Sequence, residues 1–141
     1  MFRIGIIGAG WIAHKMTLAL GYTDEACVYA IASRSEDKAR SFAEEHGIPM
    51  AYGSYEAMLD DPEVDLVYIA TPHSHHFAHA MLALEHGKPV LVEKAFTANA
   101  KEAKILIDTA RNKGLFITEA IWTRYMPLSH KIREIMDSGI I

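Results

Sequence analysis

The 141 residues contain one cysteine, Cys27. An internal disulfide is therefore impossible, and a metal site built from several cysteines is excluded as well. Because free cysteine is usually buried and Cys27 lies in an apolar stretch, we expect it to pack in the core. Such cysteine usage is typical of a reducing compartment, so we expect a cytoplasmic protein.

The sequence also lacks a dominant charge and a long apolar run. The formal net charge of −4 gives no reason to expect nucleic acid or an anionic membrane as a partner. Gly8, Gly10, His14 and Lys15 interrupt the apolar stretch over residues 4–20, well short of the roughly 20 apolar residues of a membrane span. The stretch does not have the order of a signal peptide either. We expect a soluble protein that holds any anion by local geometry.

Half of the residues are hydrophobic, which is enough for the core of one domain. Short runs rich in Val, Ile and Leu alternate with segments of helical periodicity. This order predicts an α/β fold of the Rossmann type, a doubly wound parallel sheet with helices on both faces. The expected strands cover about residues 2–7, 26–32, 51–52, 66–70, 90–92 and 115–118. The expected helices cover about residues 11–20, 36–46 (capped by Ser35), 54–60, 75–86, 101–113 (capped by Asn99) and 128–137.

The pattern Gly8-x-Gly10-x-x-Ala13 lies between the first strand and the first helix. Gly8 permits a tight turn, Gly10 lets the backbone approach a pyrophosphate, and the small Ala13 lets the helix pack closely on the strand. Backbone N–H groups of Trp11 and Ile12, at the positive end of the helix dipole, would hold the pyrophosphate. In this strand–turn–helix context the pattern favours a dinucleotide site over an ordinary turn.

The end of the second strand indicates which dinucleotide is bound. An NAD-selective domain usually has Asp or Glu there, bonded to the ribose 2′-hydroxyl. Here Ser33 and Arg34 end the strand, Lys38 follows one helical turn later, and the first carboxylate is Glu36. Arg34 can pair with a 2′-phosphate while Ser33 donates a hydrogen bond; alternatively, Arg34 and Lys38 are solvated surface charges. We expect NADP(H), with NAD(H) as the alternative.

Thr71 and Pro72 end the strand over residues 66–70, and three histidines follow within four residues. Because the carboxyl edge of such a sheet faces the ligand crevice, we expect Thr71 and Pro72 to line the nicotinamide ribose. We expect His73 and His76 to face the cofactor and His75 to face solvent. No carboxylate or cysteine with ligand spacing accompanies these histidines, so we expect no metal site.

Two further strand ends carry candidate residues at the same edge. Lys94, after Glu93, can give or take a proton if its surroundings lower its pKa; otherwise it is a surface lysine. Trp122 and Arg124 follow the last strand. They can wall a nicotinamide pocket and hold a polar substrate, or they form a packing contact only.

Together these motifs resemble the glucose–fructose oxidoreductase / inositol dehydrogenase / MocA (Gfo/Idh/MocA) family. The last motif is most similar to the branch of dimeric trans-dihydrodiol dehydrogenase and NADP-dependent D-xylose dehydrogenase. The resemblance implies hydride transfer between a nicotinamide cofactor and a sugar, polyol or trans-diol, with Lys94 as the catalytic residue and Glu93, Trp122 and Arg124 at the cofactor. The motifs that carry it are Gly8-x-Gly10-x-x-Ala13, Ser33-Arg34, Thr71-Pro72-His73-x-x-His76, Gly87-Lys88-Pro89-Val90-x-x-Glu93-Lys94 and Glu119-Ala120-Ile121-Trp122-Thr123-Arg124-Tyr125-x-Pro127.

The sequence departs from the family pattern in two ways. The family has proline after the lysine, whereas this chain has Ala95; a cis bond costs about 2.5–4 kcal/mol before such a residue, so the backbone there is left open. The family also has a C-terminal domain that supplies much of the substrate pocket. We expect a fragment with a dinucleotide-binding domain over residues 1–125 and, over 126–141, a connecting helix and the truncated start of that domain. The full-length parent is expected to be a homo-oligomer.

Two functions fit this pattern. The first is the cofactor-binding half of a dehydrogenase, and the second is a non-catalytic module that senses NADP(H) and regulates a partner. A sensor has no need of a proton-transfer lysine, so the pair Glu93-Lys94 favours the enzyme. We expect these 141 residues alone to bind cofactor with negligible turnover.

Overall fold

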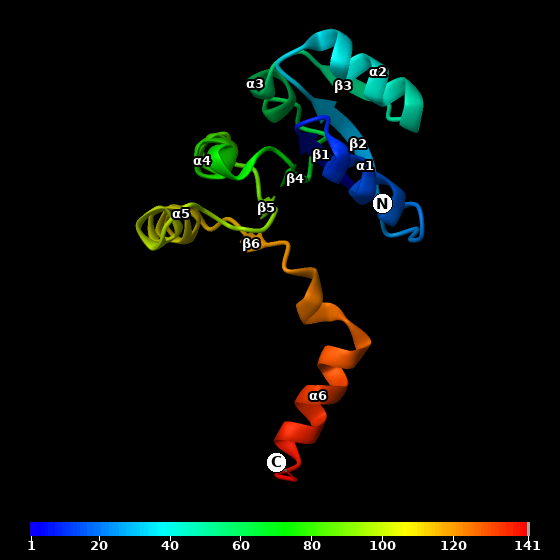
Figure 1. The fold of residues 1–141 in the computed structure, drawn as a ribbon. Coiled ribbons are helices and arrows are strands. Elements are labelled where there is room, and N and C mark those ends of the chain that lie inside the picture. Colours follow the sequence, from blue (N-terminus) through cyan, green and yellow to red (C-terminus); the bar gives the residue numbers. More distant parts are fainter. Residues whose placement is uncertain (141) are drawn as a thin grey trace.

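A computed structural model describes residues 1–140 and places their strands in one parallel sheet (Figure 1). The strand order is β3-β2-β1-β4-β5-β6, and every neighbouring pair is parallel. The same order defines the doubly wound dinucleotide-binding sheet, so the predicted fold class is confirmed. The strands are β1 (Phe2–Ile7), β2 (Ala26–Ala32), β3 (Met50–Tyr52), β4 (Leu66–Ile69), β5 (Val90–Val92) and β6 (Ile117–Glu119).

Helices connect the strands and begin close to the predicted residues. Ser35 accepts a hydrogen bond from the Lys38 amide at 3.3 Å, and Asn99 accepts one from the Glu102 amide at 3.0 Å, so both predicted caps are confirmed. The α-helices are α1 (Trp11–Leu20), α2 (Glu36–His46), α3 (Tyr55–Leu59), α4 (His76–Glu85), α5 (Ala100–Lys113) and α6 (Pro127–Asp137). Two short 3-10 helices precede α4 and α6, namely η1 (His73–His75) and η2 (Trp122–Tyr125).

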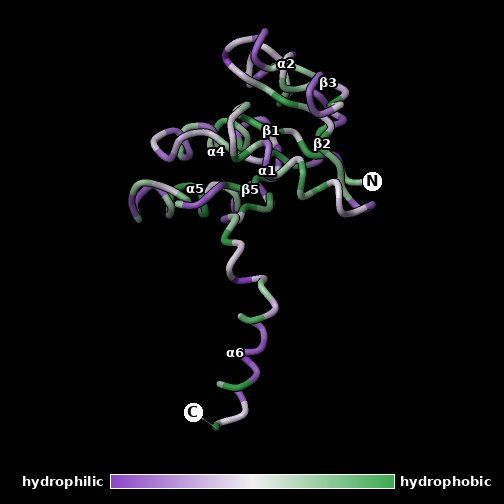
Figure 2. The backbone as a smooth tube through the Cα atoms, turned by 45° about the vertical axis from the view of Figure 1, so that its right-hand side comes forward, coloured by the Kyte–Doolittle hydropathy of each residue, from purple (hydrophilic) through white to green (hydrophobic). Residues whose placement is uncertain are grey.

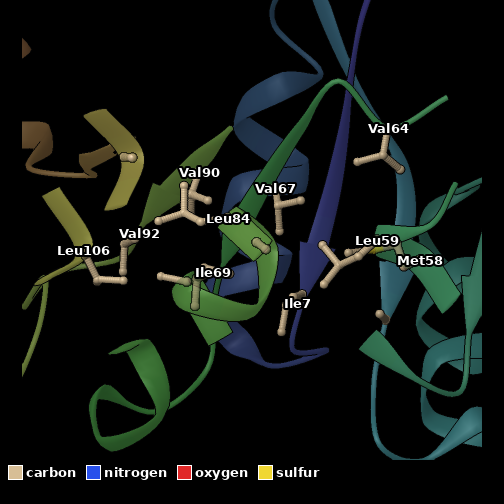
Figure 3. Close-up of a cluster of buried hydrophobic side chains, with 14 of the residues drawn as sticks. Ile7, Met58, Leu59, Val64, Val67, Ile69, Leu84, Val90, Val92 and Leu106 are labelled. Carbon is tan, nitrogen blue, oxygen red and sulfur yellow. The ribbon is translucent and has the colours of Figure 1, made fainter. Parts of the chain in front are cut away.

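The sheet carries a buried apolar cluster on each face. The larger cluster lies under α3, α4 and α5, and Figure 3 shows strand residues such as Ile69 and Val92 meeting Leu84 and Leu106. The other cluster joins Ile6 of β1 and its neighbours to α1 and α2. Alternate residues of a strand point to opposite faces, so a strand covered on both faces is apolar along its whole length. Helix packing on both faces thus explains the continuous apolar runs of the sequence.

Two details differ from the sequence-based expectation. The last strand begins at Ile117 because the Leu115 amide still bonds to the Ala110 carbonyl at the end of α5. Cys27, at the start of β2, is only half-buried and does not belong to either apolar cluster. The last strand therefore begins two residues later than predicted, and Cys27 is not a core residue.

Helix α6 extends away from the sheet (Figure 1). Leu128, Ile132, Ile135 and Met136 are exposed and share one face of the helix, and Figure 2 shows apolar and polar segments alternating along it. None of the helices within residues 1–140 combines the length and the apolar content that a bilayer crossing demands. The sheet and its other helices therefore form their core without α6.

Candidate functional site

The strand register brings the predicted site segments to one edge of the sheet. Ile7 lies opposite both Ala32 and Ile69, Ile69 lies opposite Val92, and Val92 lies opposite Glu119. Since all strands are parallel, the segments that follow these residues leave the sheet at a common edge. This is the carboxyl edge at which doubly wound sheets bind their ligands.

A cavity of about 430 Å³ lies at this edge. It includes many of the residues that the motifs predicted and adds one residue each from α3, η1 and α4, together with two alanines that follow strands. The predicted residues that line it are Gly8, Gly10, Trp11, Ile12, Ser33, Arg34, Lys38, Thr71 and Pro72. The additional residues are Ala9, Tyr55, Ala70, His75 and His79. The structure thus brings the glycine turn, the end of β2 and the end of β4 together in one hollow.

The fold itself, and not only a bound ligand, requires glycine at position 8. Its φ is +102°, a conformation that residues with a side chain rarely adopt. A Cβ atom at this position would also lie 2.9 Å from Thr71 Cγ2 and 3.1 Å from the Ala70 carbonyl oxygen. The turn between β1 and α1 therefore packs against the end of β4 with no room for a side chain.

Gly10 serves a different purpose, because a Cβ atom there would meet nothing within 4 Å. Its φ of −119° suits any residue, and it caps α1 without a side-chain hydrogen bond to the helix. The amides of Trp11 and Ile12 open that helix, where backbone N–H groups have no intrahelical partner. An anion at this point meets several donors and the positive end of the helix dipole.

The end of β2 supplies the positive charge of the cavity. Arg34 and Lys38 are exposed at its wall, and neither makes an ion pair with any described carboxylate. Glu36, the nearest acidic residue in sequence, pairs with Arg40 instead. Ser33 is buried, and its hydroxyl oxygen accepts the Ser35 amide at 3.3 Å, which leaves its O–H free to donate. The cavity wall formed by residues 1–140 contains no Asp or Glu.

Two histidines of the cavity wall were not predicted to lie there. His75, expected to face solvent, is half-buried and stacks on His79 with ring centroids 5.5 Å apart. His79 Nδ1 lies 3.0 Å from the Thr71 hydroxyl oxygen. Burial lowers the pKa of His79 below its ordinary value of 6.5, and the nearby charges of His75 and Arg34 lower it further. His79 is therefore neutral at pH 7.

The structure places His73 and His76, which we expected to face the cofactor, in two different environments. His73 is exposed and does not line the cavity, and His76 is fully buried. His76 Nε2 lies 2.9 Å from the Thr71 carbonyl oxygen, and its Nδ1 lies 2.7 Å from the Ala95 carbonyl oxygen. His76 thus connects the segment after β4 to the segment after β5. The short η1 helix shifts the helical phase of these residues, which is why His75 replaces them at the wall.

Lys94 lies outside the cavity, on an exposed turn whose backbone is firmly held. The bond between Lys94 and Ala95 is cis. The next peptide has both polar groups bonded, the Ala95 carbonyl to His76 and the Phe96 amide to a Glu119 carboxylate oxygen at 2.8 Å. Two elements therefore fix the turn that carries the lysine.

Glu93 is also held by its neighbours. Its carboxylate accepts hydrogen bonds from the Tyr68 hydroxyl and from the Lys94 amide, the latter at 3.0 Å. Burial raises the pKa of Tyr68, and the hydrogen bond and charge of Glu93 raise it further. The Tyr68 phenol is therefore a fixed donor to Glu93 at neutral pH.

Glu93 and Trp122 line a second cavity of about 540 Å³. Its wall is largely apolar and combines α1 residues such as Met16 with Leu91 and Phe116. Ile12 borders both cavities. Arg124 is exposed and lines neither. The first cavity therefore contains neither the lysine nor the Trp–Arg pair of the predicted site.

The sequence did not predict the contributions of Tyr55, His79 and Glu119 to this site. Tyr55 and His79 reach the cavity from separate helices, with rings 4.8 Å apart. In the sequence, Glu119 stands out only as part of a family motif. The four-residue spacing of His75 and His79 was a usable signal for one helix face, whereas Tyr55 and Glu119 depend on strand order.

Comparison with known proteins finds named dehydrogenases among the relatives of this chain. The chain is 61% identical over 90 residues, 64% of its length, to D-xylose 1-dehydrogenase (NADP(+)) of Hypocrea jecorina, of which it covers 23%. It is 42% identical over 141 residues, 99% of its length, to human trans-1,2-dihydrobenzene-1,2-diol dehydrogenase. This alignment covers 42% of the length of the human enzyme. The chain thus spans less than half of the length of these enzymes.

Solved structures show the same fold. A 3-ketoreductase from Actinomadura kijaniata, crystallised with TDP-benzene and NADP, superposes with a TM-score of 0.90 at 34% identity, over 99% of this chain and 44% of its own. The model of the Gfo/Idh/MocA family, described as an oxidoreductase family with an NAD-binding Rossmann fold, matches residues 2–120. The chain therefore belongs to the Gfo/Idh/MocA oxidoreductase family.

Proposed function

We propose that this chain is the NADP(H)-binding part of an oxidoreductase that acts on a hydroxyl-bearing carbon of a sugar, polyol or trans-diol. One observation carries the proposal: Arg34 and Lys38 stand without carboxylate partners at a cavity that has no acidic residue in its described wall and is continuous with the Gly8–Gly10 turn. A 2′-phosphate is a dianion that such a pair can neutralise. A ribose 2′-hydroxyl would instead call for a carboxylate.

The cavity residues divide into three groups along the dinucleotide. Gly8 and Gly10 with the amides of Trp11 and Ile12 would hold the pyrophosphate. The 2′-phosphate would be held by Ser33, Arg34 and Lys38. The nicotinamide ribose would be held by Thr71 and Pro72, which lie beside the neutral His79.

Lys94 is proposed to hold or receive the proton of the substrate hydroxyl. The bound nicotinamide supplies or accepts the hydride. His76 and Glu119 are positioning residues, because they bond to the two polar groups of the peptide that follows Ala95. Through this peptide they fix the turn on which the lysine stands.

Four more residues remain proposed cofactor contacts. Glu93 adjoins the lysine, and its carboxylate is fixed by the buried Tyr68. His73 begins η1, directly after Pro72 of the cavity wall, while Trp122 and Arg124 lie in η2, close to the end of β6. These three side chains are exposed and are free to adjust to a ligand.

The relatives support this assignment at the level of the whole enzyme. One is named as an NADP(+)-dependent xylose dehydrogenase, another as a dihydrodiol dehydrogenase, and the ketoreductase was crystallised with NADP. We propose that residues 1–125 form the dinucleotide-binding domain and that residues 126–141 lead into a substrate domain. We further propose a cytoplasmic homo-oligomer, with the free thiol of Cys27 fitting a reducing compartment.

Turnover tests the proposal directly. The full-length protein and the 141-residue chain are assayed with NADP⁺ and a panel of aldoses and diols. We expect turnover from the full-length protein only, and its Lys94→Ala variant should lose most of kcat while retaining NADPH affinity. A full-length protein that binds NADPH without any turnover would instead support the NADP(H)-sensing module. Turnover by the 141-residue chain would refute the need for a second domain.

A further inference from the structure

Two histidines and a glutamate meet on the face of the sheet that α1 and α2 cover. His14 Nδ1 of α1 lies 3.1 Å from His46 Nε2 at the end of α2. A Glu45 carboxylate oxygen lies 3.9 Å from the same atom of His14 and 3.6 Å from the same atom of His46. These three ligand atoms lie within 4.8 Å of one another, the single such grouping of His, Cys, Asp and Glu found among residues 1–140.

The separations match the coordination shell of a small divalent metal. Zn–N distances of about 2.0–2.1 Å and a tetrahedral angle place neighbouring ligand atoms about 3.3–3.5 Å apart. The three observed separations of 3.1, 3.6 and 3.9 Å bracket this value. An ion between the three atoms therefore requires shifts of a few tenths of an ångström. The exposed Glu45 side chain can shorten its two longer separations by small torsional adjustments within its rotamer.

The two imidazoles are held in place by the fold. The His46 side chain is only 7% exposed, and its ring packs against the buried Phe42 with centroids 4.5 Å apart. Gly47, with φ of +65°, ends α2 directly after it and fixes the direction of the chain. His14 lies in the middle of α1, one turn after the glycine turn. Both nitrogens thus come from regular helices, which hold ligands more rigidly than loops do.

The site also has access and room for further ligands. The His14 side chain is 36% exposed and borders a cavity of about 380 Å³ that it shares with Glu45, His46 and the residues of the glycine turn. Water can enter this cavity and complete the coordination. The hydrogen bond between the rings is no obstacle, because the ring that carries the shared proton can move it to its other nitrogen.

From this geometry we propose that His14, Glu45 and His46 bind a divalent transition metal, with Zn²⁺ as the ion that fits best. Two imidazole nitrogens, one carboxylate oxygen and a water make a four-coordinate site of the kind that Zn²⁺ accepts. The ion would link α1 to α2, two helices that the sequence separates by 32 positions at the histidines. Because of this separation, no local sequence pattern indicates the site. The proposal is independent of the proposed function.

Metal titration of the 141-residue chain tests the site. The protein is treated with a chelator and titrated with Zn²⁺ in competition with a chromophoric indicator, and Co²⁺ is added separately to record its visible absorption. We expect one equivalent to bind, a Co²⁺ spectrum of four-coordinate intensity and a rise in Tm with Zn²⁺. His14→Gln and His46→Gln should each weaken binding at least tenfold, and Glu45→Gln should weaken it less, because that carboxylate is exposed.

His130→Gln is the matched control, since it removes an exposed imidazole from α6, far from the cluster in sequence. It should bind Zn²⁺ as the unmodified chain does. His14→Gln is the decisive variant if His46→Gln, which loses a largely buried ring, fails to fold. Binding that persists unchanged in His14→Gln, or an unmodified chain that binds less than one equivalent at 100 μM Zn²⁺ (a concentration on the order of weak surface binding), would overturn the proposal.

Discussion

At Gly8 a Cβ atom would lie 2.9 Å from Thr71 Cγ2 in a backbone with φ of +102°, whereas at Gly10 it would meet nothing within 4 Å. Gly8→Ala should therefore lower the free energy of unfolding by about 1–3 kcal/mol. Gly10→Ala should change it by less than about 1 kcal/mol but weaken NADPH binding at least tenfold, because the methyl group occupies the space of the pyrophosphate. Urea unfolding and NADPH fluorescence titration measure the two effects. Equal stability losses would show that both glycines serve folding.

His79 should make the stability of the chain depend on pH. Its folded-state pKa is lowered by burial and then by the charges of His75 and Arg34, so protonation favours the unfolded chain. Its contribution to stability is complete above the ordinary pKa of 6.5 and is lost as the pH falls through the folded-state value. Urea unfolding at pH 7.5 and 5.5 should show a smaller loss of stability in His79→Gln than in the unmodified chain. Parallel losses in the two proteins would contradict this.

The turn after β5 is held by two other elements, α4 through His76 and β6 through Glu119. Glu119→Ala removes the acceptor for the Phe96 amide and should cost about 1–3 kcal/mol of stability. In the full-length enzyme it should lower kcat with little change in the Kd for NADPH, because Lys94 loses its fixed turn. Glu119→Gln retains an acceptor oxygen and should restore most of kcat. If Glu119→Ala weakens NADPH binding as strongly as it lowers kcat, the residue is not acting through the turn.

Helix α6 should contribute little to the stability of the sheet. Its residues are exposed or half-buried, and it extends away from the other elements (Figure 1). Deleting residues 127–141 should therefore change the free energy of unfolding by no more than about 1 kcal/mol. Thermal and urea unfolding of the shortened chain check this. A large loss would mean that α6 packs on the sheet and that the division near residue 125 is wrong.

The helices and strands could be predicted from the sequence, because apolar runs, capping residues and helix-ending glycines are local signals. The glycine turn and the Ser33-Arg34 strand end were readable for the same reason, since each follows a strand directly. The sequence did not predict which histidine of residues 73–76 faces the cavity. A 3-10 turn has about three residues per turn, so it changes which of these side chains reaches the cavity wall. The roles of Tyr55 and Glu119 depend on which strands are neighbours, and no local pattern specifies that order.

For the molecule as a whole, the charge balance explains why the site must be local. A net charge of −4 repels a dinucleotide that carries phosphates, so the overall field does not attract it. The attraction comes from Arg34, Lys38 and the start of α1, which the sheet order brings to one cavity. The affinity for the 2′-phosphate should therefore depend on very few side chains.

Titration of the 141-residue chain with NADPH and with NADH tests this account most directly. Arg34→Ala removes one charge-assisted contact, which should weaken NADPH binding by about tenfold to a hundredfold and leave NADH binding within about twofold. Arg40→Ala is the matched control, because Arg40 is an exposed arginine of the following helix α2 that pairs with Glu36 and does not line the cavity. It should leave both affinities unchanged. Equal losses of NADPH and NADH binding in Arg34→Ala would contradict the assignment of this cavity to NADP(H).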